Sequence, residues 1–220
     1  GVLIAAVGEG MCFLFNAVSY LAVILSLCFM KLTFIRDYYK GQVLPGLKEG
    51  VAYVFNFVPI RAIILLLALT SLAGMPFMVL MPVFAKDVFH GGPHTLGFFM
   101  GAPGVGALMG AVYLASRKSV LGLGRMIALT SMLFGIGLMA FSYSRVLWFS
   151  LVMLVLSGFG RMVQIASSNT IIQTIVDDDK RGRVMSLYTM AFMGMVPFGS
   201  LLAVSYTHLR AHGTVLDLVC

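Results

Sequence analysis

Six long apolar blocks constrain this chain more than any other feature of its sequence. A helix needs about 20 apolar residues to cross the roughly 30 Å hydrocarbon core of a bilayer, because each residue adds about 1.5 Å. Blocks of this length without a polar face are typical of membrane spans and not of helices that cover a soluble core. The sequence therefore predicts an all-α transmembrane fold with spans over Met11–Met30, Ala62–Phe84, Thr95–Ala115, Met126–Tyr143, Val146–Thr170 and Val184–Ala203.

The composition agrees with a lipid environment. Hydrophobic residues make up 60% of the chain and charged residues only 10%, whereas soluble domains are closer to balance. The net charge of +7 comes from Lys and Arg scattered through short polar gaps, while nucleic-acid-binding proteins gather these residues in one patch. We expect the lipid bilayer as a partner and no nucleic acid. The three cysteines form no CxxC pair or ligand-like spacing, so neither a disulfide framework nor a metal site is predicted.

Basic residues divide the gaps between the blocks into two kinds. Cytoplasmic loops keep Lys and Arg, whereas short translocated loops carry few. The second and fourth gaps hold only Lys86 and Arg145. The other three gaps are basic, and we place them in the cytoplasm: Lys31, Arg36, Lys40, Lys48 and Arg61 flank the first, Arg117, Lys118 and Arg125 the third, and Lys180, Arg181 and Arg183 the fifth.

The first gap, residues 31–61, ends in a segment with helical periodicity. Apolar residues recur there at helical spacing, with Lys48 and Glu49 on the opposite side. This pattern is typical of an amphipathic helix in the membrane interface, whereas a solvated linker, the alternative, rarely keeps such a period. The apolar positions are Leu47, Val51, Val54, Phe55 and Val58.

Glycine and proline indicate where the spans pack or bend. Two Gly-x-x-x-Gly pairs predict close backbone approach in lipid; they are Gly97 with Gly101 and Gly106 with Gly110. Pro76 and Pro197 predict bent helices whose freed backbone groups face protein or a wet cavity. The glycine-rich GAPGVG lies inside an apolar block with no strand before it, so it does not predict a nucleotide site, and we expect no cofactor.

Arg161 lies inside a predicted span, and such a residue is a functional candidate because its desolvation is costly. Counted from Val146, it lies about 22 Å into a core of about 30 Å. Two roles stay open: snorkelling to the cytoplasmic surface or an inner-gate contact, and direct contact with an anionic substrate. Gln164, Asn169 and Gln173 follow on the same helix and predict a water-lined vestibule, with ordinary interhelical hydrogen bonds as the alternative.

Four segments resemble major facilitator superfamily exporters of the enterobactin-exporter and macrolide-efflux type. The sixth helix of that family is similar to GEGMCFLFNAVSYLAVI, and the end of its seventh helix and its eighth helix are similar to MPVFAKDVFHGG and LGFFMGAPGVGALMG. The loop between the tenth and eleventh helices is similar to NTIIQTIVDDDKRGRVMSLYTM. One departure is Ser116, where the superfamily's loop signature after the eighth helix often has Asp.

The resemblance implies a division of the chain. Residues 1–30 correspond to the end of the N-terminal half, with a stump of the fifth helix at Val2–Val7 and then the sixth helix. Residues 31–61 correspond to the cytoplasmic loop between the halves, and residues 62–203 to helices seven to eleven of the C-terminal six-helix half, which lacks its last helix. Residues 204–220 are too polar for another span and resemble translated sequencing-adapter sequence, with THLRAH as the core. We expect a foreign tail there; a genuine exposed terminus is the alternative.

The fifth gap carries an acidic turn followed by basic residues. Carboxylates beside basic residues in a cytoplasmic loop form solvated ion pairs more readily than a cation site. We therefore assign to this loop an inner gate whose ion pairs break as the two halves of a transporter rock. Its residues are Asp178, Asp179, Arg181, Gly182 and Arg183.

The function implied by the resemblance is proton-coupled efflux of a small organic molecule by alternating access. The cargo would be a drug, a macrolide or a siderophore, and the full-length protein a multi-pass monomer in the bacterial inner membrane. No predicted span contains an acidic residue, so proton-coupling carboxylates are expected elsewhere in the protein. A non-transporting scaffold or sensor and an importer of the same fold are the alternatives. An enzyme is not expected, because no His/Asp or Ser/His constellation is visible in the sequence.

Overall fold

The described part of the chain is helical, with no strand. The computed structural model describes residues 2–30, 43–117, 119 and 121–205, and the chain divides into two units, residues 1–41 and 42–220. In the first unit, helix α1 runs over Val2–Phe29. The predicted break between a stump at Val2–Val7 and a span from Met11 is therefore wrong. Glycine disfavours a helix by only about 1 kcal/mol relative to alanine, so Gly8 and Gly10 do not end this one.

The second unit is a bundle of helices. Its helices are α2 (Val43–Asn56), α3 (Val58–Val83), the π-helical turn η1 (Phe84–Val88), α4 (Pro93–Ser116), α5 (Leu123–Tyr143), α6 (Leu147–Ile175) and α7 (Asp178–Met193). A further helical segment covers residues 196–205. Five helices in the described part are long and apolar enough to cross a membrane: Val58–Val88, Pro93–Ser116, Leu123–Tyr143, Leu147–Ile175 and Asp178–Ser205. The predicted all-α, multi-pass membrane fold is confirmed.

Several predicted boundaries shift. The span that begins in α3 continues through η1, so Lys86 and Asp87 lie at its end, and both are exposed. The last span begins at Asp178 instead of Val184. Residues 204–205 continue the helix, and residues 206–220 of the expected foreign tail lie outside the described residues.

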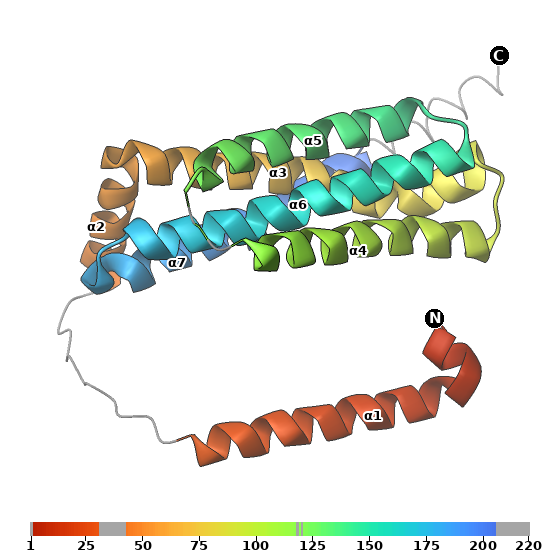
Figure 1. The fold of residues 1–220 in the computed structure, drawn as a ribbon, viewed down its shortest axis with the longest axis horizontal. Helices are drawn as coiled ribbons and strands as arrows, with labels where there is room; N and C mark the ends of the chain where they lie inside the picture. The colour runs from red at the N-terminus through yellow and green to blue at the C-terminus, as the bar shows by residue number, and fades with distance from the viewer. Residues whose placement is uncertain (1, 31–42, 118, 120, 206–220) are drawn as a thin grey trace. The chain divides into compact units, whose positions relative to one another are not determined.

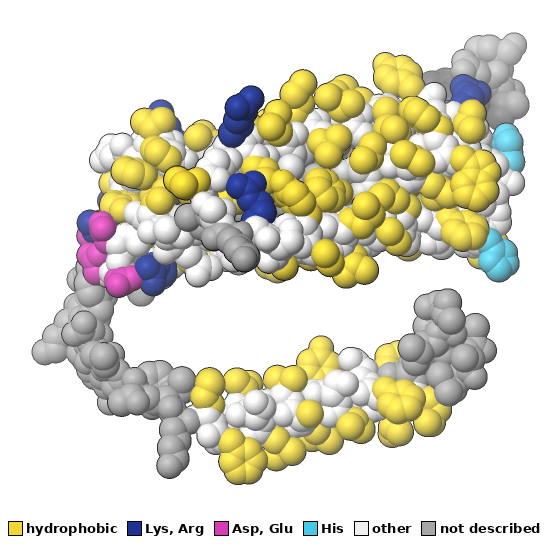
Figure 2. All heavy atoms as spheres, viewed as in Figure 1, with side chains coloured by type: hydrophobic (Ala, Val, Ile, Leu, Met, Phe, Trp, Pro, Cys, Tyr) yellow, Lys and Arg dark blue, Asp and Glu magenta, His cyan; other side chains and the backbone are white. Residues whose placement is uncertain are grey.

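Successive helices of the second unit run in alternating directions. Figure 1 shows the α4–α5 and α6–α7 connections at the end of the bundle where α2 lies, and the η1–α4 and α5–α6 connections at the opposite end. The described part of the first gap predicted to be cytoplasmic, and the third and fifth gaps, therefore lie at one end of the bundle. Large apolar side chains cover the outside of the helices, among them Leu69, Leu108 and Trp148, and Figure 2 shows them along the length of the bundle. Such a surface matches lipid and not water.

The predicted amphipathic helix is present as α2, and Figure 1 shows it lying across the end of the bundle. Val54 is buried in a core cluster with Ile60, Val184 and Tyr188, whereas Leu47 and Phe55 are exposed. Only part of the predicted apolar stripe therefore packs on the bundle. Its position in the membrane interface stays a prediction.

Glycines bring α4 and α5 into close contact with α6. A Cβ added at Gly106 of α4 would overlap the carbonyl oxygen of Val155, and one at Gly158 of α6 would overlap the backbone of Pro103. On the other side of α6, a Cβ added at Gly160 would lie 2.7 Å from the carbonyl oxygen of Thr130 in α5. Helices in lipid associate through such close packing, because lipid tails are as apolar as the side chains.

Only one of the two predicted Gly-x-x-x-Gly pairs packs. Gly110 joins Gly106 at the α6 contact, since its added Cβ would lie 3.1 Å from the carbonyl oxygen of Phe159. Gly97 and Gly101 are exposed, and an added Cβ at either has no atom within 4 Å. The packing prediction is therefore wrong for this pair. The spacing is the same, but Gly97 and Gly101 lie on a side of α4 that α6 does not cover.

The two prolines have different surroundings. Pro76 lies inside α3, which continues through it to Val83. Before Pro197 the last span is interrupted at residues 194–195, between α7 and the segment 196–205. Gly199 then lets this segment approach α3, because its added Cβ would lie 3.0 Å from the carbonyl oxygen of Leu72.

We predict that Gly106→Ala and Gly158→Ala each destabilise the bundle. The added methyl groups overlap the backbone of the opposing helix, and overpacking of this kind costs about 1–3 kcal/mol. Gly101→Ala is the matched control, because its methyl group meets nothing and alanine favours a helix. Thermal unfolding in detergent micelles should give lower midpoints for the first two variants only. Equal midpoints for all three would contradict the close α4–α6 contact.

Candidate functional site

Arg161 lies at the midpoint of α6. The helix runs over Leu147–Ile175 and has 29 residues, so 14 residues flank Arg161 on each side. At about 1.5 Å per residue, each helix end is about 21 Å away, which is beyond the reach of an arginine side chain. The hydrogen bonds of the guanidinium go to side chains of α3 and α6 instead of along α6 to the cytoplasmic surface. The predicted snorkelling therefore finds no support in these contacts, and the helix continues beyond the predicted end at Thr170.

The guanidinium of Arg161 points to α3. Its Nη1 donates to the hydroxyl oxygen of Thr70 at 2.7 Å, and its Nη2 donates to that of Ser71 at 2.9 Å. Gln164 completes the group, because its Nε2 donates to the same Thr70 oxygen at 2.9 Å and its Oε1 lies 3.5 Å from Nη1 of Arg161. The Thr70 hydroxyl donates in turn to the carbonyl oxygen of Leu67 at 3.1 Å. We call Arg161, Gln164, Thr70 and Ser71 the α3–α6 polar cluster.

Two aromatic rings contact the same guanidinium. Its central carbon lies 5.4 Å from the ring centroid of Phe134 in α5 and 5.5 Å from that of Phe192 in α7. A cation is attracted to the face of an aromatic ring, and more strongly where water is excluded. Four helices, α3, α5, α6 and α7, therefore meet around this one charge.

The other predicted lumen residues lie elsewhere on α6. Gln173 donates to Asn169 at 2.9 Å, and Gln173 is exposed. Neither residue joins the α3–α6 polar cluster, so the predicted polar side of the helix divides into two groups. Ser167 and Ser168 are buried between them, and their hydroxyl oxygens have no hydrogen-bond partner among the described residues. The sequence pattern did not indicate Thr70 and Ser71 as site residues, because both lie inside an apolar run.

A second charged site joins α2 to the start of α7. Glu49 forms an ion pair with Arg183 at 2.7 Å. Tyr53 donates to a carboxylate oxygen of Asp177 at 3.3 Å, and the ammonium of Lys180 lies 4.8 Å from the Tyr53 ring centroid. We call these five residues the α2–α7 clamp. Figure 2 shows acidic and basic side chains gathered at this end of the bundle.

A glycine on α2 makes room for the clamp. Gly50 is buried, and a Cβ added there would lie 3.1 Å from the Cβ of Arg183. The side chain of Arg183 is 22% exposed and that of Glu49 is 50% exposed, so their ion pair is partly sheltered from water. Ion pairs gain strength with such shelter, whereas fully exposed pairs contribute about 0–1 kcal/mol.

The residues predicted for the inner gate do not act as one group. Arg181 pairs with Asp178 one turn away on α7, with side chains 44% and 86% exposed. Asp179 is exposed in the first turn of α7, and an added Cβ at Gly182 meets no atom within 4 Å. Of the five, Arg183 contacts α2 through its ion pair with Glu49. Glu49 lies on the polar side of the amphipathic segment, but the sequence did not indicate that it pairs with Arg183.

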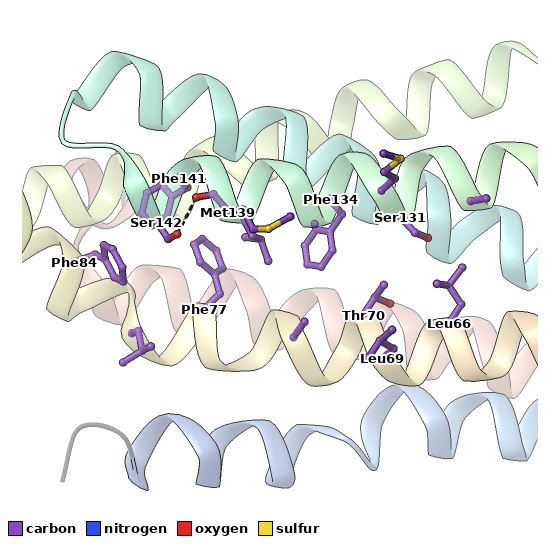
Figure 3. A pocket seen from close by; sticks show the side chains of 16 residues that line it. Leu66, Leu69, Thr70, Phe77, Phe84, Ser131, Phe134, Met139, Phe141 and Ser142 are labelled. Atoms are coloured by element: carbon purple, nitrogen blue, oxygen red, sulfur yellow. Dashed lines mark hydrogen bonds between the residues drawn. The ribbon is translucent and has the colours of Figure 1, made fainter. Parts of the chain in front are cut away.

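An apolar groove runs between α3 and α5. It has a volume of about 770 Å³ and none of its lining residues is charged. Figure 3 shows Leu69 and Phe77 of α3 and Phe84 of η1 facing Met139 and Phe141 of α5. Thr70 and Phe134, which contact Arg161, also line it. We call this the α3–α5 groove.

Within the described residues, no three His, Cys, Asp or Glu side chains come together in a way that holds a metal ion. The two histidines near the η1–α4 connection do not share a helix, because His90 has a positive φ of 47° and α4 begins at Pro93.

Comparisons with known proteins point to one family. The model of a family described as transmembrane secretion effector, within the major facilitator superfamily, matches residues 1–215. The chain is similar to a staphyloferrin A transporter from Staphylococcus aureus, with 28% identity over 134 residues. That alignment covers 61% of this chain and 33% of the relative, so the chain spans only part of that protein. No solved structure matches.

We predict that Arg183→Gln loosens α2 from the bundle. Loss of a partly sheltered ion pair costs about 0.5–1 kcal/mol, which corresponds to roughly two- to five-fold faster local opening. Hydrogen–deuterium exchange of the α2 amides should rise by that factor. Arg181→Gln is the matched control, because Arg181 pairs within α7, and it should leave α2 unchanged. The clamp is refuted if both variants give the same α2 exchange as the parent chain.

Proposed function

Because the chain belongs to the transmembrane secretion effector family of the major facilitator superfamily, we propose that the full-length protein exports a small organic molecule from a bacterial cell. The family match over residues 1–215 is the observation that carries this proposal. Transport proceeds by alternating access, in which the two halves rock around a cargo bound near the membrane midplane. The protein lies in the inner membrane as a monomer.

The cargo is a drug, a macrolide or a siderophore, as the resemblance to exporters implies. The similarity to a staphyloferrin A transporter supports a small organic cargo. Proton antiport supplies the energy. In the described spans, acidic residues occur only at helix ends, as Asp87, Asp178 and Asp179. The carboxylates that couple transport to protons therefore lie outside these five helices.

The α2–α7 clamp is the inner gate. Residues 31–61 form the connection between the two halves, and α2 within it contacts the start of α7 through Glu49 and Arg183. Rocking of one half against the other pulls on this connection. An ion pair with side chains 22% and 50% exposed is strong enough to hold one state and weak enough to break during each cycle.

The α3–α5 groove receives another helix of the full-length protein. Its lining extends from Leu66 in α3 to Phe84 in η1 and over Ala128–Ser142 in α5, or about 27 Å and 21 Å at 1.5 Å per residue. This length is close to the bilayer core. A long apolar groove without charged residues suits a membrane helix better than a compact cargo. The relative is about three times as long as its alignment with this chain, which leaves several helices to supply an occupant.

We predict that Arg183→Ala impairs export by the full-length protein while membrane insertion stays intact. Cells that express the parent protein should accumulate less of one compound from a panel of fluorescent drugs and siderophores, and a protonophore should abolish the difference. Arg183→Ala should reduce this efflux several-fold. The exchanged pair Glu49→Arg with Arg183→Glu should restore part of it, because the ion pair is re-formed with its charges reversed.

Arg181→Ala serves as the control for that experiment and should export normally. Normal export by Arg183→Ala would remove the gate role. No accumulation difference for any compound, despite verified insertion, would favour the scaffold or importer alternatives.

We predict that the groove is covered in the full-length protein. Leu69→Cys and Met139→Cys, in a background without native cysteines, should react with a membrane-dissolved maleimide in this chain and be protected at least ten-fold in the full-length protein. Leu129→Cys on α5 is the control, because Leu129 is 57% exposed and does not line the groove. It should react in both. Equal reactivity of all three positions in the full-length protein would contradict an occupied groove.

A further inference from the structure

Among the described residues, no carboxylate pairs with Arg161. The ion pairs in the described part of the chain involve Lys180, Arg181 and Arg183, all at the start of α7. The three hydrogen-bond acceptors of Arg161 are two hydroxyl oxygens and an amide oxygen, and all are neutral. A charge inside a membrane span is costly unless an opposite charge or a water-filled cavity accompanies it.

The guanidinium of Arg161 has N–H donors that are not used in hydrogen bonds to described residues. It has five N–H donors, and three hydrogen bonds to described residues use three of them. One of these, to Gln164, is long at 3.5 Å. Arg161 is also partly exposed, so an incoming group can reach it. A planar guanidinium with two donors to spare matches a carboxylate, which accepts two parallel N–H bonds.

The surroundings hold the guanidinium in place before a ligand arrives. Thr70 and Ser71 fix one side of it to α3, and Gln164 fixes Thr70 from α6. The Phe134 and Phe192 rings contact it from two further helices. Such prior ordering reduces the entropy that binding costs. The site also lies at the middle of α6, and secondary transporters bind their cargo near the membrane midplane.

We infer that Arg161 binds an anionic group of the cargo, so that the exporter carries organic anions, and carboxylates above all. This inference rests on the proposed export function and adds the chemical class of the substrate. The aromatic rings beside the guanidinium suit an apolar or aromatic body next to the anionic group. An anionic lipid headgroup offers the same charge, and the experiment separates the two sources.

The test uses the full-length protein in nanodiscs of phosphatidylcholine, with 1-pyrenebutyrate and its uncharged amide as matched probes. The parent protein should bind the acid at least ten-fold more tightly than the amide, because a charge-assisted pair is worth about 1.5–3 kcal/mol. Arg161→Gln should bind both probes equally. Arg181→Gln, which removes an exposed charge on α7, should keep the preference of the parent protein.

A second variant covers the case in which Arg161→Gln does not fold. Thr70→Ala with Ser71→Ala removes the α3 acceptors that order the guanidinium and leaves its charge, so the double variant should still prefer the acid but by a smaller factor than the parent protein. If Arg161 only tied α3 to α6, this double variant and Arg161→Gln would lose stability alike and neither would change the ratio of the two affinities. Equal binding of acid and amide by the parent protein would overturn the inference.

Two further arms separate the remaining outcomes. A preference for the acid that disappears in phosphatidylglycerol nanodiscs would assign the site to lipid headgroups and overturn the cargo assignment. Export of the two probes is then measured in cells. Preferential binding of the acid without export would support the anion site at Arg161 and count against the proposed export function. Export of acid and amide at equal rates would support the export function and overturn the inference that the cargo is an anion.

Discussion

Close packing around α6 is the constraint on which the rest of the second unit depends. In lipid, helices gain little from burying apolar side chains against each other, so they must fit closely to associate. Gly158 admits α4 on one side of α6, and Gly160 admits α5 on the other. Arg161 follows directly and points to α3. Three neighbouring positions therefore connect α6 to three helices.

Helix α7 contacts both Arg161 in the α3–α6 polar cluster and Glu49 in the α2–α7 clamp. Phe192 of α7 contacts the guanidinium of Arg161, and Arg183 of α7 forms the ion pair with α2. The two residues are nine positions apart on a continuous helix, or about 13 Å along its axis. A movement of α7 that separates Arg183 from Glu49 also moves an aromatic ring beside Arg161. The α2–α7 clamp and the α3–α6 polar cluster are in this way linked through α7, as the proposed alternation between two states requires.

The sequence predicted the spans and the amphipathic helix, which depend on long runs of residues. It did not predict contacts between residues that are far apart in the sequence. The last five spans and the α2 helix were confirmed, because apolar length and helical period act locally. Gly97 and Gly101 have the same spacing as Gly106 and Gly110, but only the second pair faces α6. Spacing alone does not say which side of a helix has a neighbour. The partner of Arg183 lies 134 positions away at Glu49, and the partners of Arg161 are two hydroxyls inside an apolar run, so no local pattern indicated either contact.

In the proposed mechanism, α3 holds a single positive charge in the helix bundle, and this charge binds an anionic group of the cargo. A cryo-EM structure of the full-length protein in lipid nanodiscs, without added ligand, tests this arrangement. We expect Nη1 of Arg161 near 2.7 Å from the Thr70 hydroxyl oxygen, as it is here, with no protein carboxylate in contact. A guanidinium that faces the lipid, or one paired with an Asp or Glu from the rest of the protein, would refute the proposal.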